Sequence, residues 1–184
     1  QFVDLLHGTT GSESSYASYR SSRASRPHVV YVGSNDGLLH GFRAGANSSD
    51  GEWDSRSAND GAELMAYMPA RVVETIHSTT GTLAFSSPQY LKNTYVNATP
   101  GVGDLYVGGA WRTWLVGGLG NGGIAGGPVA TAGGTATGTL YVLDVTNPAG
   151  FSESQAGSIV VGEWNSSNLS CGGVACGQHL GSVV

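Results

Sequence analysis

The sequence predicts an all-β protein, and three observations carry this prediction. Short runs rich in valine and aromatic residues recur along the chain, separated by turn residues. The runs arrive close together without intervening helices, which favours antiparallel meanders in a sandwich or propeller over a parallel sheet. One order of events (strand, glycine-rich turn, strand, loop, strand) occurs over 29–68 and again over 113–164. This repeat predicts a partial β-propeller of two blades plus the start of a third.

The chain of 184 residues is long enough for one domain with a core, but its composition is unusual. Charged residues make up 11% of it, whereas glycine alone numbers 30, as suits a turn-rich β protein outside the cytoplasm. A net charge of -5 leaves no basic surface for phosphates, so we expect no nucleic-acid binding. The sequence has neither an apolar run of about 18 residues nor the order of a signal peptide. We expect a mature chain or an internal piece of a longer protein.

We divide the chain into a lead-in segment, residues 1–26, and a partial β-propeller domain, residues 27–184. The lead-in is polar and combines tyrosines with arginines on an irregular face. Proline disfavours helical geometry in the residue before it. We therefore expect one short helix that ends before Pro27 and packs on the β domain or lies on its surface.

The first blade begins with a hairpin. Two β-rich runs, 29–32 and 38–42, flank a turn that contains Asn35, Asp36 and Gly37, and Asn and Gly tolerate the positive φ angles of tight turns. We expect the Asp36 side chain to bond the turn backbone. A catalytic role is not expected, because no base or nucleophile is spaced with it.

The next residues complete this blade. His40 alternates onto the same strand face as Phe42, which favours a hydrogen-bonded core or inter-blade histidine over a ligand. A third strand is expected over 63–68, where it ends at Pro69.

The loop between the second and third strands carries several acidic residues, which suggests calcium. Asp50, Asp54 and Asp60 are the candidate ligands. An EF-hand loop needs oxygen ligands at alternate positions before a glycine and an acidic residue six positions further on. Neither Gly51 nor Gly61 meets this spacing, so a solvated loop is the favoured interpretation. We expect no metal or cofactor in this chain.

Further strands are expected downstream, and they cover 94–97, 103–107, 113–117, 139–144 and 158–164. A single helical turn is expected near Pro88. The glycine-rich segment 117–138 formally matches the dinucleotide fingerprint G-x-G-x-x-G. No helix can follow these glycines to hold a pyrophosphate, so we interpret the segment as a loop between paired strands.

The last residues, 180–184, would begin a third unit. A closed propeller needs four or more blades. Another part of the polypeptide, or other chains, would therefore have to complete the ring.

Structural roles are expected for three tryptophans, one arginine and one aspartate of the second blade. Trp111 should fill inter-blade space, as should Trp114 and Trp164, and an exposed tryptophan could serve adhesion. Arg112 would bridge blades through backbone carbonyls. Asp144 would bond turn backbone, as Asp36 does in the first blade.

The two cysteines, Cys171 and Cys176, are separated by four residues rich in glycine, which can bend enough to bring the thiols together. The composition indicates an oxidising compartment, so a local disulfide is favoured. Metal binding with His179 is the alternative. It is weaker, because two cysteines and one histidine leave a ligand missing.

An ordered set of segments resembles the β-propeller domain of the PilC/PilY family of type IV pilus tip-associated proteins. The segments are 23–27, 31–42, 63–69, 103–104, 111–113, 116–120 and 143–148. The resemblance implies a seven-bladed, quinoprotein-like propeller that acts in pilus assembly, retraction control, adhesion and surface sensing. Implied partners are pilin or minor pilin subunits and a host or abiotic surface, at the pilus tip or the bacterial outer surface. The family's calcium loop lies in later blades and has no match here.

The favoured function is therefore that of a non-enzymatic, extracellular protein that acts in pilus biogenesis and adhesion. Two alternatives stay open. A fragment of a quinone-dependent dehydrogenase would need Arg, Asp and Asn residues around a cofactor and calcium. A subunit of an extracellular filament would suit the Ser, Thr and Gly surface.

Overall fold

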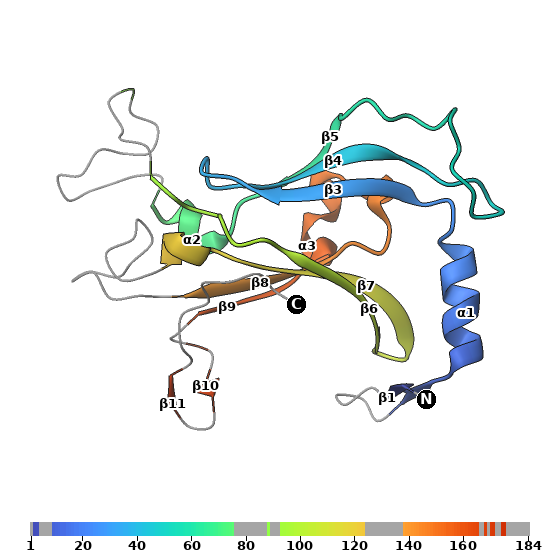
Figure 1. The fold of residues 1–184 in the computed structure, drawn as a ribbon. Coiled ribbons are helices and arrows are strands. Elements are labelled where there is room, and N and C mark those ends of the chain that lie inside the picture. The colour runs from blue at the N-terminus through green and yellow to red at the C-terminus, as the bar shows by residue number, and fades with distance from the viewer. Residues whose placement is uncertain are drawn as a thin grey trace.

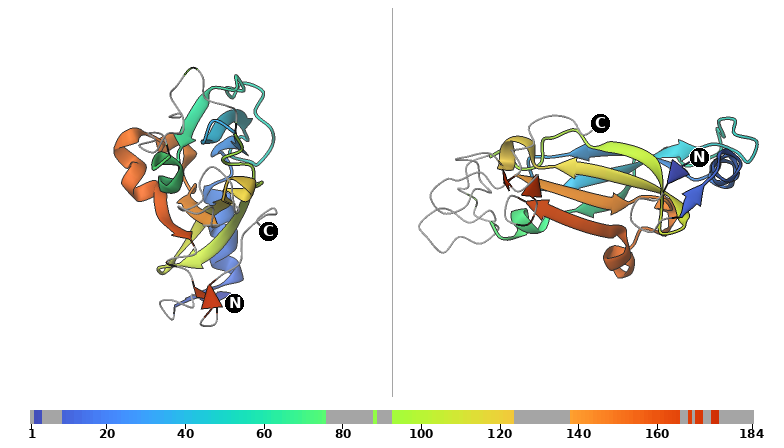
Figure 2. Two further views of the ribbon diagram at one scale, coloured as in Figure 1. Left: turned by 90° about the vertical axis from the view of Figure 1, so that its left-hand side faces the viewer. Right: turned by 90° about the horizontal axis from the view of Figure 1, so that it is seen from below.

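The computed structural model describes residues 2–3, 9–75, 88, 93–123, 138–165, 168, 170–171 and 174–175. Most of the secondary structure in these residues is antiparallel β-sheet, which confirms the predicted β class. Two larger sheets lie one above the other, and helix α1 (Glu13–Ser22) stands at one end of them (Figure 1). The view from below shows the second sheet covering the first (Figure 2).

Helix α1 begins after an N-cap residue, Ser12. The Ser15 amide donates to Ser12 Oγ (3.2 Å), and the Ser12 amide donates to Ser15 Oγ (2.9 Å), so each residue satisfies a free backbone donor of the other. The helix ends four residues before Arg26, in agreement with the expected stop ahead of Pro27.

The first sheet is a three-stranded meander made of β3 (Pro27–Gly33), β4 (Leu39–Ala46) and β5 (Glu63–Tyr67). The predicted hairpin between β3 and β4 is confirmed: the Gly37 amide donates to the Ser34 carbonyl (3.3 Å), and the Ser34 amide donates to the Leu38 carbonyl (2.9 Å). Gly37 takes a φ of +91°. Asn35 does not need the left-handed region, because glycine alone supplies it in this turn.

The second sheet is a four-stranded meander whose strands again pair in the order of the sequence. It contains β6 (Gly101–Val107), β7 (Ala110–Gly118), β8 (Thr139–Asp144) and β9 (Val160–Asn165). Strand β8 has the predicted bounds. Strand β9 starts two residues later than predicted, because Ser158 and Ile159 belong to the short helix α3 (Ala156–Ile159).

The prediction of a strand over 94–97 is wrong. This segment has no strand pairing, although Tyr95 and Val96 are fully buried. Its amides bond to carbonyls of both sheet ends instead: Val96 donates to Ser34 (3.2 Å) and Asn97 donates to Leu119 (3.4 Å). The apolar pattern that suggested a strand therefore reflects insertion of an irregular segment into the core.

The core fills the space between the two sheets. Its fully buried members include Leu39 from the first sheet and Leu115, Tyr141 and Leu143 from the second. The sheets are also joined by polar contacts of Glu163, whose carboxylate accepts bonds from the Tyr67 hydroxyl and the Ala70 amide (3.0 Å). Ala70 is the first residue of helix α2 (Ala70–Val73), so Glu163 ties β9 to the chain that follows β5.

The two sheets share an irregularity at the same place. In β5, Met65 pairs with Gly41 and Glu63 pairs with Phe42, so Leu64 is an extra residue. In β9, Gly162 pairs with Val142 and Val160 pairs with Leu143, so Val161 is the extra residue. Strands β5 and β9 are the last strands of their sheets, and a bulge that recurs in both supports the repeat inferred from the sequence.

The remaining elements of the described residues are short. They are β1 (Phe2–Val3), β2 (Thr10–Gly11), β10 (Ser170–Cys171), β11 (Val174–Ala175) and the short 3₁₀ turns Gly120–Gly123, Pro148–Gly150 and Glu153–Gln155. Within the described part of the chain, no helix is long and apolar enough to cross a membrane. Several predictions concern residues outside the described ones: Cys176, His179, the segment 180–184 and, apart from Pro88, the expected turn at 87–91. The disulfide and the third unit therefore stay predictions.

Candidate functional site

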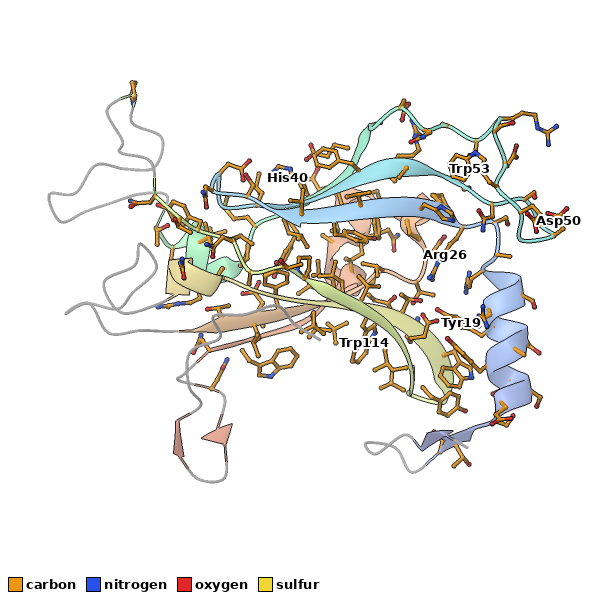
Figure 3. All side chains as sticks on the ribbon, viewed as in Figure 1. Tyr19, Arg26, His40, Asp50, Trp53 and Trp114 are labelled. Atoms are coloured by element: carbon orange, nitrogen blue, oxygen red, sulfur yellow. The ribbon has the colours of Figure 1, made fainter. Side chains whose placement is uncertain are left out.

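Three titratable side chains meet at the hairpin end of the first sheet. His40 Nε2 lies 2.9 Å from Asp36 Oδ2, and His40 Nδ1 lies 2.5 Å from Glu63 Oε1. The Asp36 carboxylate also accepts the Leu38 amide (3.0 Å), so it supports the turn as the sequence suggested. His40 stacks on Phe42, with 5.7 Å between ring centroids, and points to the side of the sheet away from the core (Figure 3).

The charges of this group are mutually stabilising. Hydrogen bonding to Glu63 raises the pKa of His40 above its usual value, and Asp36 adds to the effect against the opposing cost of burial. Burial acts to raise the pKa of Asp36, but bonds from the Leu38 amide and His40 outweigh it and lower that pKa. The two carboxylates hold different ring nitrogens, so the three residues do not converge on one point as metal ligands would. The arrangement is an ion-pair bridge from the turn to β5.

The three calcium candidates are not brought together. Asp60 forms a two-point pair with Arg43 (2.9 and 2.6 Å), Asp54 accepts bonds from Arg56, and Asp50 accepts the Ser48 hydroxyl and the Glu52 amide (3.2 Å). Each of the three carboxylates is therefore held by local partners, and the three do not form a common site. In the described ranges, no group of three or more His, Cys, Asp or Glu residues is placed to hold a metal ion.

Trp111 joins helix α1 to the hairpin of β6 and β7. Its indole Nε1 donates to Ser15 Oγ (2.9 Å), and its ring lies 4.6 Å from that of Tyr16 and 5.4 Å from that of Tyr106. The expected place of Trp111 was between blades. The structure puts it between the lead-in helix and the second sheet instead.

Arg112 and Asp144 contact one another within the second sheet. Arg112 Nη1 lies 3.4 Å from Asp144 Oδ2, and Asp144 Oδ1 accepts the Thr146 amide (3.0 Å). Asp144 therefore bonds the backbone that follows its strand. Arg112 pairs with a carboxylate of its own sheet, whereas a bond to carbonyls of another blade was expected.

A polar cluster that the sequence did not reveal lies where α1 meets the second sheet. The buried Thr113 hydroxyl has three partners: Asp104 Oδ1 (2.6 Å), Tyr19 OH (2.6 Å) and Arg26 Nη1 (2.7 Å). Because a hydroxyl has one proton and the carboxylate can only accept, Thr113 donates to Asp104 and accepts from Tyr19 and Arg26. Tyr16 donates to the other oxygen of Asp104 (3.0 Å). The partners of Thr113 are as far as 94 residues away in sequence, which is why no local motif indicates the cluster.

A cavity of about 640 Å³ opens beside this cluster, between α1 and the loop that follows β4. Arg20, Arg23 and Arg26 line its helix side, and Asn47 and Asp50 line its loop side. Figure 3 shows Arg26, Tyr19 and Asp50 at this end of the molecule. The cavity combines positive charge on one wall with hydrogen-bond acceptors on the other, a combination suited to binding.

The fold and these sites define a class of protein. It is an all-β chain of antiparallel meanders, and its described polar clusters connect turns, strands and helix α1 to one another. No family model matches the chain. It is 35% identical over 149 residues to the type IV pilus biogenesis factor PilY1 of Pseudomonas aeruginosa, a match that covers 81% of this chain and 10% of that protein. A PilY1 homolog of Xylella fastidiosa is 33% identical over 139 residues, with 76% of this chain and 7% of the homolog covered.

The chain belongs to the PilY1 family of type IV pilus biogenesis factors, which confirms the resemblance found in the sequence. It spans about a tenth of the length of the curated relatives that it matches. Among solved structures, the C-terminal domain of Pseudomonas aeruginosa PilY1 matches with 31% identity and a TM-score of 0.47, over 82% of this chain and 22% of that domain chain.

Proposed function

We propose that the two sheets are consecutive blades of a β-propeller in a non-enzymatic, extracellular factor that acts in type IV pilus biogenesis and adhesion. The name of the relatives supports the pilus role. The single structural observation that carries the propeller is the way in which the two sheets stack.

The matched bulges align the sheets residue by residue. Leu64 corresponds to Val161, and the pair Leu39 and Tyr67 then corresponds to the pair Leu140 and Trp164. In the first sheet this pair faces the core: Leu39 is fully buried there, and the ring of Tyr67 lies 5.3 Å from that of Tyr141.

In the second sheet, the corresponding pair faces the other way. Leu140 and Trp164 lie on the opposite side from Tyr141 and Leu143, the residues that contact the first sheet. The sheets thus stack head to tail, with different faces in contact. Head-to-tail stacking repeats into a ring or an open array, whereas a two-sheet sandwich related by a twofold axis would join equivalent faces.

The outward faces have the composition of interfaces. Five half-buried apolar side chains line the outer face of the second sheet: Trp114, Val116, Leu140, Val142 and Trp164. Figure 3 shows Trp114 on the side away from the first sheet. On the first sheet, Val30 and Val32 are 57% and 44% exposed on its outer face. In folded proteins, the apolar face of a sheet is normally covered by another layer of structure. We infer that further meanders of the same polypeptide form this layer.

The proposed propeller also agrees with a non-enzymatic role. The described ion pairs and buried polar groups hold turns, sheet junctions and the lead-in helix, and pilin or minor pilin subunits would bind to surfaces and loops of the ring. Contact with a host or abiotic surface would use those surfaces as well. Purified protein should therefore show no quinone-dependent oxidation of an alcohol or sugar; reproducible turnover would favour the dehydrogenase alternative.

The pilus role is tested by complementation of a strain that lacks the protein. Wild-type protein should restore surface pili, measured by shearing and immunoblot, whereas Trp114→Lys should restore few, because a charge is placed on an apolar blade face. Arg56→Gln, at an exposed arginine of the loop that follows β4, is the control and should restore them fully. Normal piliation in the strain without the protein would overturn the proposal.

A further inference from the structure

Three arginines of this chain differ from the other four. Arg43, Arg56, Arg71 and Arg112 each pair with a carboxylate at 2.5–3.4 Å. Arg20, Arg23 and Arg26 make no ion pair with any Asp or Glu that the structure describes, and all three line the 640 Å³ cavity beside α1. Arg20 and Arg23 are exposed, whereas Arg26 is half-buried and directs one nitrogen to Thr113. All three arginines are thus gathered at one cavity, which the carboxylates of Asp50 and Asp104 also line.

The floor of the cavity is built by fixed side chains. Tyr19 is 8% exposed and is held by its bond to Thr113, and the guanidinium of Arg23 lies 5.8 Å from the centroid of its ring. Arg26 is held by the same threonine. A guanidinium fixed in this way retains donors for a ligand carboxylate and loses little conformational entropy on binding.

The opposite wall supplies acceptors. It consists of Asn47, Ser49 and Asp50 from the loop after β4. Hydrogen bonds from Ser48 and from the Glu52 amide lower the pKa of Asp50, so its carboxylate is ionised at neutral pH. A carboxylate accepts hydrogen bonds from hydroxyl groups and repels a second anion. The cavity therefore favours a ligand with its negative charge at one end and hydroxyl groups at the other.

An aromatic side chain lies next to this wall. Trp53 is 51% exposed, and its ring centroid is 6.0 Å from that of His28, which lines the cavity. Figure 3 shows Trp53 and Asp50 on the loop above α1. An exposed indole offers an apolar surface against which a sugar ring can pack. The cavity volume falls in the range of small-molecule sites.

We propose that this cavity binds an acidic sugar, a saccharide unit that carries a carboxylate, with Arg20, Arg23 and Arg26 on the carboxylate and Asp50 and Asn47 on the hydroxyl groups. This inference goes beyond the proposed role in pilus biogenesis and does not depend on it. An acidic peptide offers carboxylates but few hydroxyl groups, and inorganic phosphate lacks the second end, so both fit the cavity less well.

Saturation-transfer NMR and calorimetric titration of the intact protein test the proposal, with glucuronic acid as the probe and glucose as the same ring without the carboxylate. We expect glucuronic acid to bind at least about tenfold more tightly than glucose, because a charge-assisted bond to arginine is lost with the carboxylate. The double variant Arg20→Gln/Arg23→Gln should lose at least about tenfold in affinity. Arg56→Gln makes the same kind of substitution, with the loss of one positive charge, at an exposed arginine that does not line the cavity, and it should bind as the wild type does.

Several results would overturn the proposal. One is no binding of glucuronic acid, and another is equal binding by the wild type and the double variant. Tighter binding of inorganic phosphate or of an oligoglutamate peptide, with the same dependence on Arg20 and Arg23, would identify a general anion site or a peptide site instead. Both arginines are exposed, and an unchanged circular dichroism spectrum and melting temperature of the double variant would exclude misfolding as the cause of lost binding.

Discussion

His40 is the residue whose chemistry is most directly set by its neighbours. A carboxylate faces each of its ring nitrogens, and only the protonated imidazolium can donate to both. The sequence predicted a hydrogen-bonded histidine on the face of Phe42, but not the partner from β5. Glu63 lies 23 residues away, and only the pairing of β4 with β5 brings it opposite.

This bridge predicts a pH dependence of stability. The pKa of His40 is raised in the folded state, so the stabilisation is complete below the unfolded-state pKa of about 6.5 and is lost as pH rises through the higher folded-state pKa. We expect the melting temperature of the wild type to fall, relative to that of His40→Gln, as pH rises from about 6.5 to about 8.5. Parallel melting curves of the two proteins over this range would contradict the prediction.

Two tyrosines of the core predict opposite effects of removing a hydroxyl. The Tyr141 hydroxyl is buried and has no hydrogen-bond partner among the residues that the structure describes, whereas the Tyr67 hydroxyl donates to Glu163. Tyr141→Phe should leave the free energy of unfolding unchanged or raise it by up to about 1 kcal/mol, and Tyr67→Phe should lower it by about 1–3 kcal/mol. Urea unfolding measures both values. A loss larger than about 1 kcal/mol in Tyr141→Phe would show that its hydroxyl has a stabilising role.

At the scale of elements, the strand pattern was predictable because it is local. Alternating apolar residues and turn glycines indicated β8 with its observed bounds, and the first hairpin with its turn. Segment 94–97 has the same kind of residues but fills the core as an irregular insertion, and its carbonyl partners, Ser34 and Leu119, lie in distant turns. Local propensity cannot distinguish these two outcomes, because tertiary contacts decide between them.

Strand β7 contains a glycine whose place in the sheet requires the absence of a side chain. A Cβ at Gly117 would lie 2.3 Å from Cζ of Tyr141, and the Tyr141 side chain is fully buried in the core. Gly117→Ala should therefore lower the free energy of unfolding by about 1–3 kcal/mol. Gly103→Ala in the neighbouring strand is the control, because no atom of the described residues lies within 4 Å of its Cβ position. Equal stability of the two variants in denaturant unfolding would refute the packing at Gly117.

At the scale of the whole molecule, the sequence indicated the repeat and the family but not how the units stack. Stacking depends on which face of each sheet is inward, and the structure shows this by the burial of Leu39 in the first sheet and of Tyr141 and Leu143 in the second. The cavity beside α1 could not be predicted from the sequence either, because its walls come from α1 and from a loop more than 20 residues later in the chain. Both features arise from contacts between elements and leave no local motif.

Hydroxyl-radical footprinting of the complete polypeptide tests the central claim most directly. Val30 and Val73 have the same intrinsic reactivity and similar exposure in this structure, 57% and 50%. If the sheets are consecutive blades, a further meander covers the outer face of the first sheet, and Val30 should be oxidised several-fold more slowly than Val73. Oxidation of Val30 at the rate of Val73 would contradict the account.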